Sequence, residues 1–336
     1  MELLSDFDYV LPERLIAQVP LADRTASRLL HLDRQTAAVQ HLRFADVRHL
    51  LRPGDLLVLN NTRVTAIRLI GTRPSGGKIE ALLLHELEPG IYQALVKPAK
   101  RLPIGSRLNF GELSAEIVEA GAEGLRTVRF TPFEGLNEKL AAFGEVPLPP
   151  YIHEALADRE RYQTVYGISG GSAAAPTAGL HFTMESLAQL QAMGVQTASV
   201  TLHVGIDTFR PVSVESLADH KMHGERCEVP AKTAQAVAAC QGRIIAVGTT
   251  TVRTLESFAT GKRQLSSGQM RSNLFIRNGT QFQIVDGMFT NFHLPRTTMM
   301  VMISALAGRD AVMRAYAEAI EQEYRFLSFG DSMLIL

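Results

Sequence analysis

The stretch RIIAVGTTTVRTLESFA, residues 243–259, predicts a buried strand that passes directly into a helix. Its first half is a short apolar run that ends at Gly248, and the apolar residues that follow have helical spacing. The chain just before it has the same rhythm. VQTASVTLHV (195–204) predicts a strand, and AKTAQAVAACQG (231–242) predicts a helix that begins after Pro230 and ends at Gly242. This alternation favours a sheet covered by helices.

The flanking segments extend the pattern towards both ends of the chain. Residues 297–308 and 310–325 predict helices, and SMLIL (332–336) predicts a terminal strand. GDLLVLN (54–60) has the composition of one more buried strand. The polar stretch 260–273 is expected to be a surface loop.

Between Arg63 and Arg129 the chain is instead a series of short β-rich runs separated by turn residues, namely VTAIRLIG, KIEALLLHEL, YQALVKPAK, SRLNF, SAEIVEA and LRTVRF. Such runs predict a small antiparallel barrel or sandwich. Prolines then interrupt the chain at VPLPPYI. We therefore predict an α/β fold, a mixed sheet flanked by helices, built from residues 1–62 and 150–336. A β-barrel-like domain, residues 63–149, is inserted into it.

The composition is that of an ordinary globular protein of 336 residues, with 46% hydrophobic residues and 34 basic against 34 acidic side chains. Zero net charge means that a nucleic acid would have to be held by a local patch. Two cysteines form neither a disulfide framework nor a CxxC pair, and no apolar run is long enough for a membrane span. We expect a cytoplasmic monomer with no membrane partner.

Nucleotide-binding fingerprints are absent from the sequence. SGGK (75–78) is not a P-loop, and GISGGS (167–172) does not give G-x-G-x-x-G after a strand. This argues against P-loop NTPases and against Rossmann dehydrogenases or methyltransferases.

Several polar clusters follow predicted strands, where α/β sheets usually build their sites. His203 and Gly205 follow one strand, and Thr249 and Thr250 open the helix after another. The threonines suit anion binding or simple helix capping. Arg253 lies three residues before Glu256, a spacing that also suits a surface pair.

The segment HKMHGE places His220, His223 and Glu225 within six residues. These side chains could bind a metal with a further histidine, but acid/base or substrate-binding duty is favoured and we predict no metal. TNFHLP adds Asn291, Phe292 and His293, for which a hydrogen-bonded loop is the simpler interpretation. GSAAAPTAGLHFT (171–183) is rich in small residues, which allow close approach of the backbone to a ligand or, more simply, form a tight loop before a helix.

Basic side chains gather in two places. Arg24 and Arg28 at the N-terminal end, with Asn60 and Arg63, suit bidentate contact with phosphate or carboxylate. The densest basic patch lies in the predicted barrel and comprises Lys97, Lys100, Arg101 and Arg107. An ordinary solvated surface is the alternative for both.

Along essentially its whole length the sequence resembles the S-adenosylmethionine:tRNA ribosyltransferase-isomerase family of queuosine biosynthesis. The resemblance rests on many motifs in order, FDYVLPERLIAQVP, RTASRLL, GDLLVLNNTRV, GGKIEALLL, YQTVYG, GSAAAPTAGLHFT, TLHVG, HKMHGE, AVGTTTVRTLES, TNFHLP and YRFLSFGDSMLI. The departures are local. Asp207 stands where the family usually has glycine, residues 277–279 form a different turn, and the loop near 260–273 lacks the common tryptophan.

The resemblance implies transfer and isomerisation of the ribosyl group of S-adenosylmethionine onto 7-aminomethyl-7-deazaguanine at the tRNA wobble position. The products are epoxyqueuosine-tRNA, adenine and methionine. S-adenosylmethionine is then a consumed substrate, and no cofactor is expected. This chemistry needs a base at the ribose carbon beside the sulfonium and help for the departing adenine.

Candidates for proton transfer in the matching motifs are His181, His203, His220, His223, His293 and Glu225, of which we rank His203 and His223 first. The substrate-binding candidates are Arg24, Arg28, Asn60, Arg63, Thr177, Gly179, Leu180, Phe182, Gly205, Thr249, Thr250, Arg253, Asn291 and Phe292. Residues 171–179 would close around the nucleoside, and the patch from Lys97 to Arg107 would hold the tRNA. Two alternatives remain, a non-catalytic tRNA-binding module and a base-exchanging tRNA transglycosylase, which would need a carboxylate nucleophile.

Overall fold

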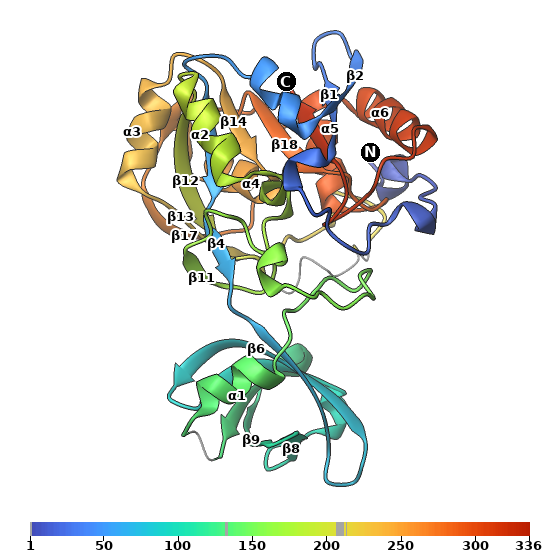
Figure 1. Ribbon diagram of the computed structural model, residues 1–336, viewed down its shortest axis with the longest axis vertical. Coiled ribbons are helices and arrows are strands. Elements are labelled where there is room, and N and C mark those ends of the chain that lie inside the picture. The colour runs from blue at the N-terminus through green and yellow to red at the C-terminus, as the bar shows by residue number, and fades with distance from the viewer. Residues whose placement is uncertain (1, 132–133, 206–211, 213) are drawn as a thin grey trace. The chain divides into compact units, whose positions relative to one another are not determined.

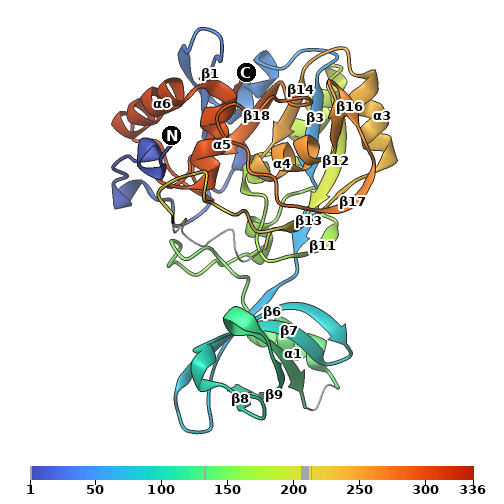
Figure 2. The same ribbon diagram turned by 180° about the vertical axis from the view of Figure 1, so that it is seen from behind.

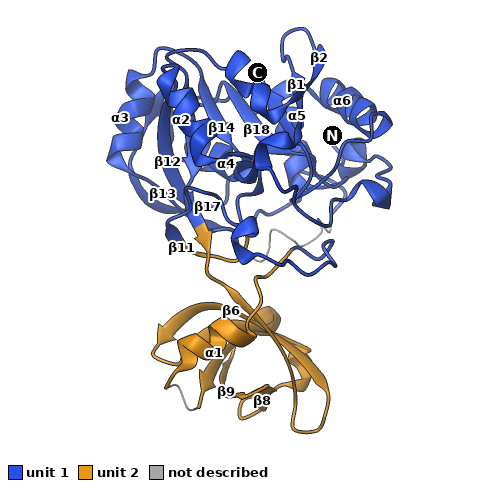
Figure 3. Cartoon of the chain, viewed as in Figure 1, with its two compact units in different colours: residues 1–62, 149–169, 175–336 blue, residues 63–148, 170–174 orange. Residues whose placement is uncertain are grey.

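The computed structural model describes residues 2–131, 134–205, 212 and 214–336. It divides into two compact units, one of residues 1–62, 149–169 and 175–336 and one of residues 63–148 and 170–174 (Figure 3). We call them the α/β unit and the barrel unit. The predicted fold class, a mixed α/β sheet with helices and a separate antiparallel barrel, is confirmed.

Nine described strands form one sheet in the α/β unit, in the order β17-β13-β12-β3-β14-β18-β19-β1-β2. The pairs β12–β3, β3–β14, β14–β18 and β19–β1 are parallel, and the other four pairs are antiparallel. The bounds are β1 (Arg28–Leu32), β2 (Val39–Arg43), β3 (Leu56–Asn60), β12 (Gln196–Leu202), β13 (Glu225–Val229), β14 (Ile244–Val247), β17 (Gly268–Ser272), β18 (Gly287–Asn291) and β19 (Ser332–Ile335). The four strands predicted from apolar runs are therefore confirmed as β3, β12, β14 and β19.

Helices lie on both faces of this sheet (Figures 1 and 2). Helix α2 (Met184–Ala192) packs with the apolar side chains of Leu57, Val247 and Phe289 on one face. Helix α4 (Thr249–Ser257) contacts β3, β12, β13 and β14, and it packs with α5 (Thr298–Ala307). The remaining helices are α3 (Ala231–Ala239) and α6 (Arg309–Glu321), with 3-10 turns at Leu4–Phe7, Glu13–Leu15, Arg24–Ala26, Phe44–His49, Arg159–Tyr162 and Thr177–His181.

Six described strands of the barrel unit form a closed antiparallel barrel in the order β10-β7-β6-β5-β8-β9. They are β5 (Ile67–Thr72), β6 (Lys78–Glu88), β7 (Ile91–Lys97), β8 (Arg107–Phe110), β9 (Leu113–Ala120) and β10 (Leu125–Phe130). These strands match the six predicted β-rich runs. Alternate residues fill the interior, as the period of two requires. Helix α1 (Leu136–Phe143) and the 3-10 turns Ala99–Arg101 and Ala122–Gly124 complete the unit.

The prediction of a surface loop at residues 260–273 is wrong. This stretch contains β15 (Ala259–Gly261), β16 (Gln264–Leu265) and β17, the edge strand of the large sheet. Four of the five residues of β17 are exposed, so the strand lacks the apolar alternation that would reveal it. A further two-stranded sheet pairs β4 (Thr62–Val64) with β11 (Ser169–Ser172). No described helix is long and apolar enough to cross a membrane.

Candidate active site

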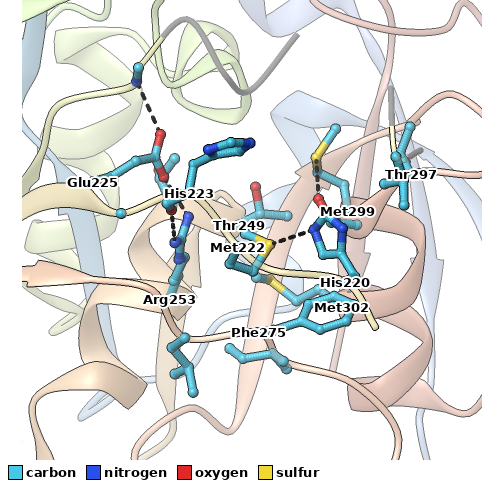
Figure 4. Close-up of a pocket in the computed structure, with 17 residues that line it drawn as sticks. His220, Met222, His223, Glu225, Thr249, Arg253, Phe275, Thr297, Met299 and Met302 are labelled. Atoms are coloured by element: carbon cyan, nitrogen blue, oxygen red, sulfur yellow. Dashed lines mark hydrogen bonds and ion pairs between the residues drawn. The ribbon is translucent and has the colours of Figure 1, made fainter. Parts of the chain in front are cut away.

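A cavity of about 130 Å³ lies in the α/β unit, where β13, α4 and α5 begin. Its polar lining comes from His220, His223, Glu225, Thr249, Thr250 and Arg253, with the backbone of Gly205 and Gly224. Its apolar lining includes Met222, Phe275, Met299 and Met302 (Figure 4). The structure therefore brings together the HKMHGE segment, the threonines Thr249 and Thr250, and Gly205, which the sequence places up to 45 residues apart.

The charged part of the cavity is a buried ion pair. Arg253 Nη1 donates to Glu225 Oε2 at 2.6 Å, and the two side chains are only 6% and 10% exposed. Nη2 of Arg253 donates to the backbone carbonyls of His223 and Ser272, both at 2.8 Å. The other carboxylate oxygen of Glu225 accepts from the N–H of Gly205 at 3.0 Å. Removal from water lowers the pKa of Arg253, and Glu225 opposes that shift. The alternative of a surface pair between Arg253 and Glu256 is wrong, since Arg253 is buried and pairs with Glu225.

The two histidines of HKMHGE have different surroundings. The ring of His220 contacts Phe275 edge-on at 5.1 Å, and its Nε2 lies 3.3 Å from the sulfur of Met222. Burial, followed by the charge of His223, lowers the pKa of His220. A neutral imidazole at pH 7 results, with a nitrogen lone pair available to accept a proton. The His223 side chain is exposed at the rim of the cavity.

The threonines stand at the N-terminal end of α4. Gly248 adopts φ +91°, a left-handed conformation that glycine tolerates, and the helix begins at the next residue. Asn60 is fully buried, and its amide donates to Thr250 Oγ1 at 3.1 Å and to the carbonyl of Leu202 at 3.1 Å. Asn60 therefore joins β3, β12 and α4 just below the cavity rather than lining it.

Four other predicted residues form a hydrogen-bond network with Ser27 outside this cavity. Asn291 donates to His181 Nε2 at 3.2 Å, and Thr177 Oγ1 donates to Asn291 Oδ1 at 3.0 Å. His181 Nδ1–H is therefore left to donate to Ser27 Oγ at 2.8 Å, and Ser27 donates to the carbonyl of Arg24. Burial, with the nearby charge of Arg24, lowers the pKa of His181 to about 3. The ring stays neutral, and its two nitrogens serve to connect three distant segments.

Arg24 completes this network through backbone acceptors. Its guanidinium donates to the carbonyls of Leu180, Glu160 and Gln163. Arg28 is similarly engaged, with Asp331 at 3.2 Å and the ring of Tyr324 at 4.0 Å. Both predicted phosphate ligands thus have partners within the α/β unit.

The small-residue run 171–183 packs against neighbouring side chains of the protein itself. A Cβ added to Gly179 would lie 2.0 Å from Tyr166 Oη and 2.8 Å from Thr164 Cγ2. Leu180 is buried, and Phe182 is fully buried beside Phe44 and Phe289. Close approach of side chains therefore accounts for the glycine and the aromatic ring, and neither lines the cavity.

Phe292 is fully buried between Tyr316 and Phe326 and lies outside the cavity lining. His293 hydrogen-bonds Thr290 Oγ1 at 2.6 Å, and burial lowers its pKa to about 4. His203 Nδ1 contacts Thr62 Oγ1 at 2.9 Å, and burial with the charge of Arg226 lowers its pKa. His203 is two residues from Gly205 but does not itself line the cavity.

The remaining candidates belong to the barrel unit or lie outside the described residues. Arg63 is half-buried, and Lys97, Lys100, Arg101 and Arg107 are exposed, which suits a binding surface and a solvated one equally. Asp207 is outside the described residues. Among the residues that are described, no three histidine, cysteine or carboxylate side chains are grouped closely enough to hold a metal ion.

The three methionines that line the cavity, Met222, Met299 and Met302, were not among the residues predicted from the sequence. Met299 and Met302 lie in a helix that is apolar on all sides, so periodicity gives no sign that one edge faces a cavity. Met222, within HKMHGE, was the available signal. Thioethers are polarizable and adapt to irregular apolar surfaces. The cavity thus combines a carboxylate, two imidazoles and an apolar wall.

Comparison with known proteins gives two findings over the same range. A family model described as queuosine biosynthesis protein matches residues 4–335. A crystal structure of an S-adenosylmethionine tRNA ribosyltransferase from Thermotoga maritima is 38% identical, with a TM-score of 0.57. The match covers 99% of this chain and 100% of that one. Both similarities extend through the α/β unit and the barrel unit alike, and the resemblance inferred from the motifs is confirmed.

Proposed function

The chain belongs to the queuosine biosynthesis protein family, and on that premise we propose that it is an S-adenosylmethionine:tRNA ribosyltransferase-isomerase. In the proposed reaction the ribosyl group of S-adenosylmethionine moves onto the aminomethyl group of 7-aminomethyl-7-deazaguanine in tRNA. The products are epoxyqueuosine-tRNA, adenine and methionine. S-adenosylmethionine is then a substrate, and the enzyme acts as a cytoplasmic monomer that needs no metal.

The observation that carries this proposal is the chemistry of the cavity beside α4. A sulfonium is a cation with apolar substituents, so its site should combine electron-rich oxygen atoms with apolar surface. Glu225 supplies the carboxylate, held by Gly205 and Arg253. Met299, Met302 and Phe275 supply the apolar surface.

Proton transfer is assigned to the two histidines of the cavity. The sulfonium acidifies the adjacent ribose carbon, and a neutral imidazole within the cavity is suited to remove that proton. His220 fits this role because its lowered pKa keeps it unprotonated at pH 7. His223, at the rim, is placed to donate a hydrogen bond to the departing adenine. His203 ranks behind both because it lies outside the cavity lining.

The arrangement favours this reaction over base exchange. A transglycosylase needs a free carboxylate to attack the sugar, whereas both oxygens of Glu225 accept hydrogen bonds from Gly205 and Arg253. Membership of a biosynthetic enzyme family likewise favours catalysis over mere tRNA binding.

Labelled S-adenosylmethionine incubated with tRNA carrying the deazaguanine precursor tests the proposal. Release of adenine and methionine in equal amounts is the expected result. Release of a tRNA base would instead indicate exchange, and no release would leave only a binding protein. His220→Gln should lose most turnover at pH 7, whereas His153→Gln, on the exposed surface, should retain it.

A further inference from the structure

Two arginines face each other across the edge of the large sheet. Arg226 of β13 pairs with Arg271 of β17 in antiparallel register, and both side chains are exposed. Side chains directly opposite in such a pair have Cβ atoms about 4.5–5.5 Å apart, and like charges there are destabilising. The arrangement therefore costs stability unless an anion joins it.

No carboxylate within the described residues compensates this pair. Neither guanidinium forms an ion pair or hydrogen bond with another described residue. The one acidic side chain on the same face of β13 is Glu228, and it accepts a hydrogen bond from Gln269. A cation on an edge strand also discourages aggregation, but Arg271 alone would serve that purpose. The second arginine, on an inner strand, needs another reason.

The predicted basic patch of the barrel is different in this respect. Lys97 lies opposite Glu80 and Arg107 lies opposite Glu116 in the barrel register. Opposite charges in these positions stabilise the strands by about 0.2–1 kcal/mol per pair. Half of that patch therefore faces opposite charges across the strands, whereas Arg226 and Arg271 face only each other.

The arginine pair borders the candidate active site. A Cβ placed on Gly224 would lie 2.5 Å from Arg271 Nε and 2.8 Å from its Cγ, so the Arg271 side chain lies directly over that glycine. Gly224 lines the cavity. On the other side Arg226 accepts a backbone hydrogen bond from His203, and its charge contributes to lowering the pKa of that histidine. The surplus positive charge thus stands beside the cavity.

We propose that Arg226 and Arg271 bind backbone phosphates of the RNA strand that presents its base to the cavity. Planar guanidinium groups recognise phosphate oxygens with two parallel hydrogen bonds, and a pair of them suits successive phosphates of a single strand. This inference rests on the proposed function, because it places the tRNA at the site where S-adenosylmethionine is consumed. It also explains how a chain of zero net charge holds a polyanion.

The double variant Arg226→Gln/Arg271→Gln tests the inference. Loss of two phosphate contacts should reduce the slope of log K against log salt by about 1.4, at about 0.7 per phosphate of a single strand. At about 0.15 M salt the same loss weakens tRNA binding by roughly tenfold. We expect this in the tRNA KM and in direct binding by fluorescence anisotropy. Calorimetric binding of S-adenosylmethionine alone should be unchanged.

Two control variants separate a local contact from general electrostatics. Lys232→Gln/Arg314→Gln removes the same charge from exposed positions on α3 and α6 and should leave tRNA affinity within twofold. The variant Lys100→Glu/Arg101→Glu measures, by the same tRNA affinity, how much the basic patch of the barrel contributes to tRNA binding. An unchanged affinity in the Arg226/Arg271 variant overturns the inference, as does an equal loss in the Lys232/Arg314 control. If the native enzyme bound tRNA through these arginines but released no adenine, the proposed function would fail instead.

Discussion

The buried pair of Glu225 and Arg253 gives the sharpest test of the site. Glu225→Gln keeps the size of the side chain and an oxygen for the N–H of Gly205, but it removes the charge that compensates Arg253. The guanidinium then keeps only its two carbonyl acceptors in a side chain that is 6% exposed. Removing one partner of a buried pair typically costs about 3–5 kcal/mol, and the remaining acceptors favour the lower end.

About 3 kcal/mol corresponds to a fall in melting temperature of roughly 6–12 °C, at about 2–4 °C per kcal/mol for a domain of this size. Scanning calorimetry of Glu225→Gln, Arg253→Met and the double variant measures this. The double variant should be less destabilised than the sum of the two singles, because it leaves no buried charge unpaired. It should nevertheless be inactive and bind S-adenosylmethionine weakly, since the carboxylate is absent. Single variants that melt within about 2 °C of the native protein, or strictly additive losses, would refute the reasoning.

Gly179→Ala should destabilise the fold rather than affect S-adenosylmethionine binding selectively, because the new Cβ would collide with Tyr166 Oη at 2.0 Å. Adding Tyr166→Phe to the same chain should recover part of the lost melting temperature. No recovery would count against the collision. His223→Gln should move the acidic limb of the kcat/KM profile to higher pH. The charge of His223 lowers the pKa of His220, and a base acts only above its pKa. An unmoved limb would contradict that assignment. Prolonged incubation with a chelator should leave turnover unchanged. Activity that is lost to the chelator and restored by zinc would instead indicate a metal site.

Apolar patterning identified four of the nine described strands of the large sheet, and it missed the fully buried β18 as well as the exposed strands at the sheet edges. Strands β3 and β14 are continuous apolar runs, because both faces of the central sheet are covered. By contrast, β2 and β17 lie at the two ends of the sheet and expose most of their residues, so their sequences resemble polar loops. Burial on one side only leaves too weak a periodic signal in strands of five residues.

The sequence segments that line the candidate site could be predicted, but the side chains that pair with one another there could not. HKMHGE and the threonine cluster were recognised as polar residues near strand ends, and both line the cavity. The partner of Arg253 was not identifiable, since Glu225 is 28 residues away in the chain and Glu256 is only three. Likewise Phe182 and His181 have the composition of a ligand pocket. A buried aromatic core with one hydrogen-bonded histidine has the same composition, and only packing distinguishes the two.

The position of β19 has a consequence for biosynthesis. Within the described residues it lies between β18 and β1, so the hairpin of β1 and β2 joins the large sheet through a strand made roughly 300 residues later. Until Ser332–Ile335 leaves the ribosome, the leucines of β1 have no strand to pair with on that side. Long-range parallel pairing of this kind is slow. Before β19 pairs with it, the hairpin of β1 and β2 exposes apolar surface to other nascent chains. Completion of the sheet, and with it the full burial of Leu29 and Leu30, therefore waits until β19 has been made and has left the ribosome.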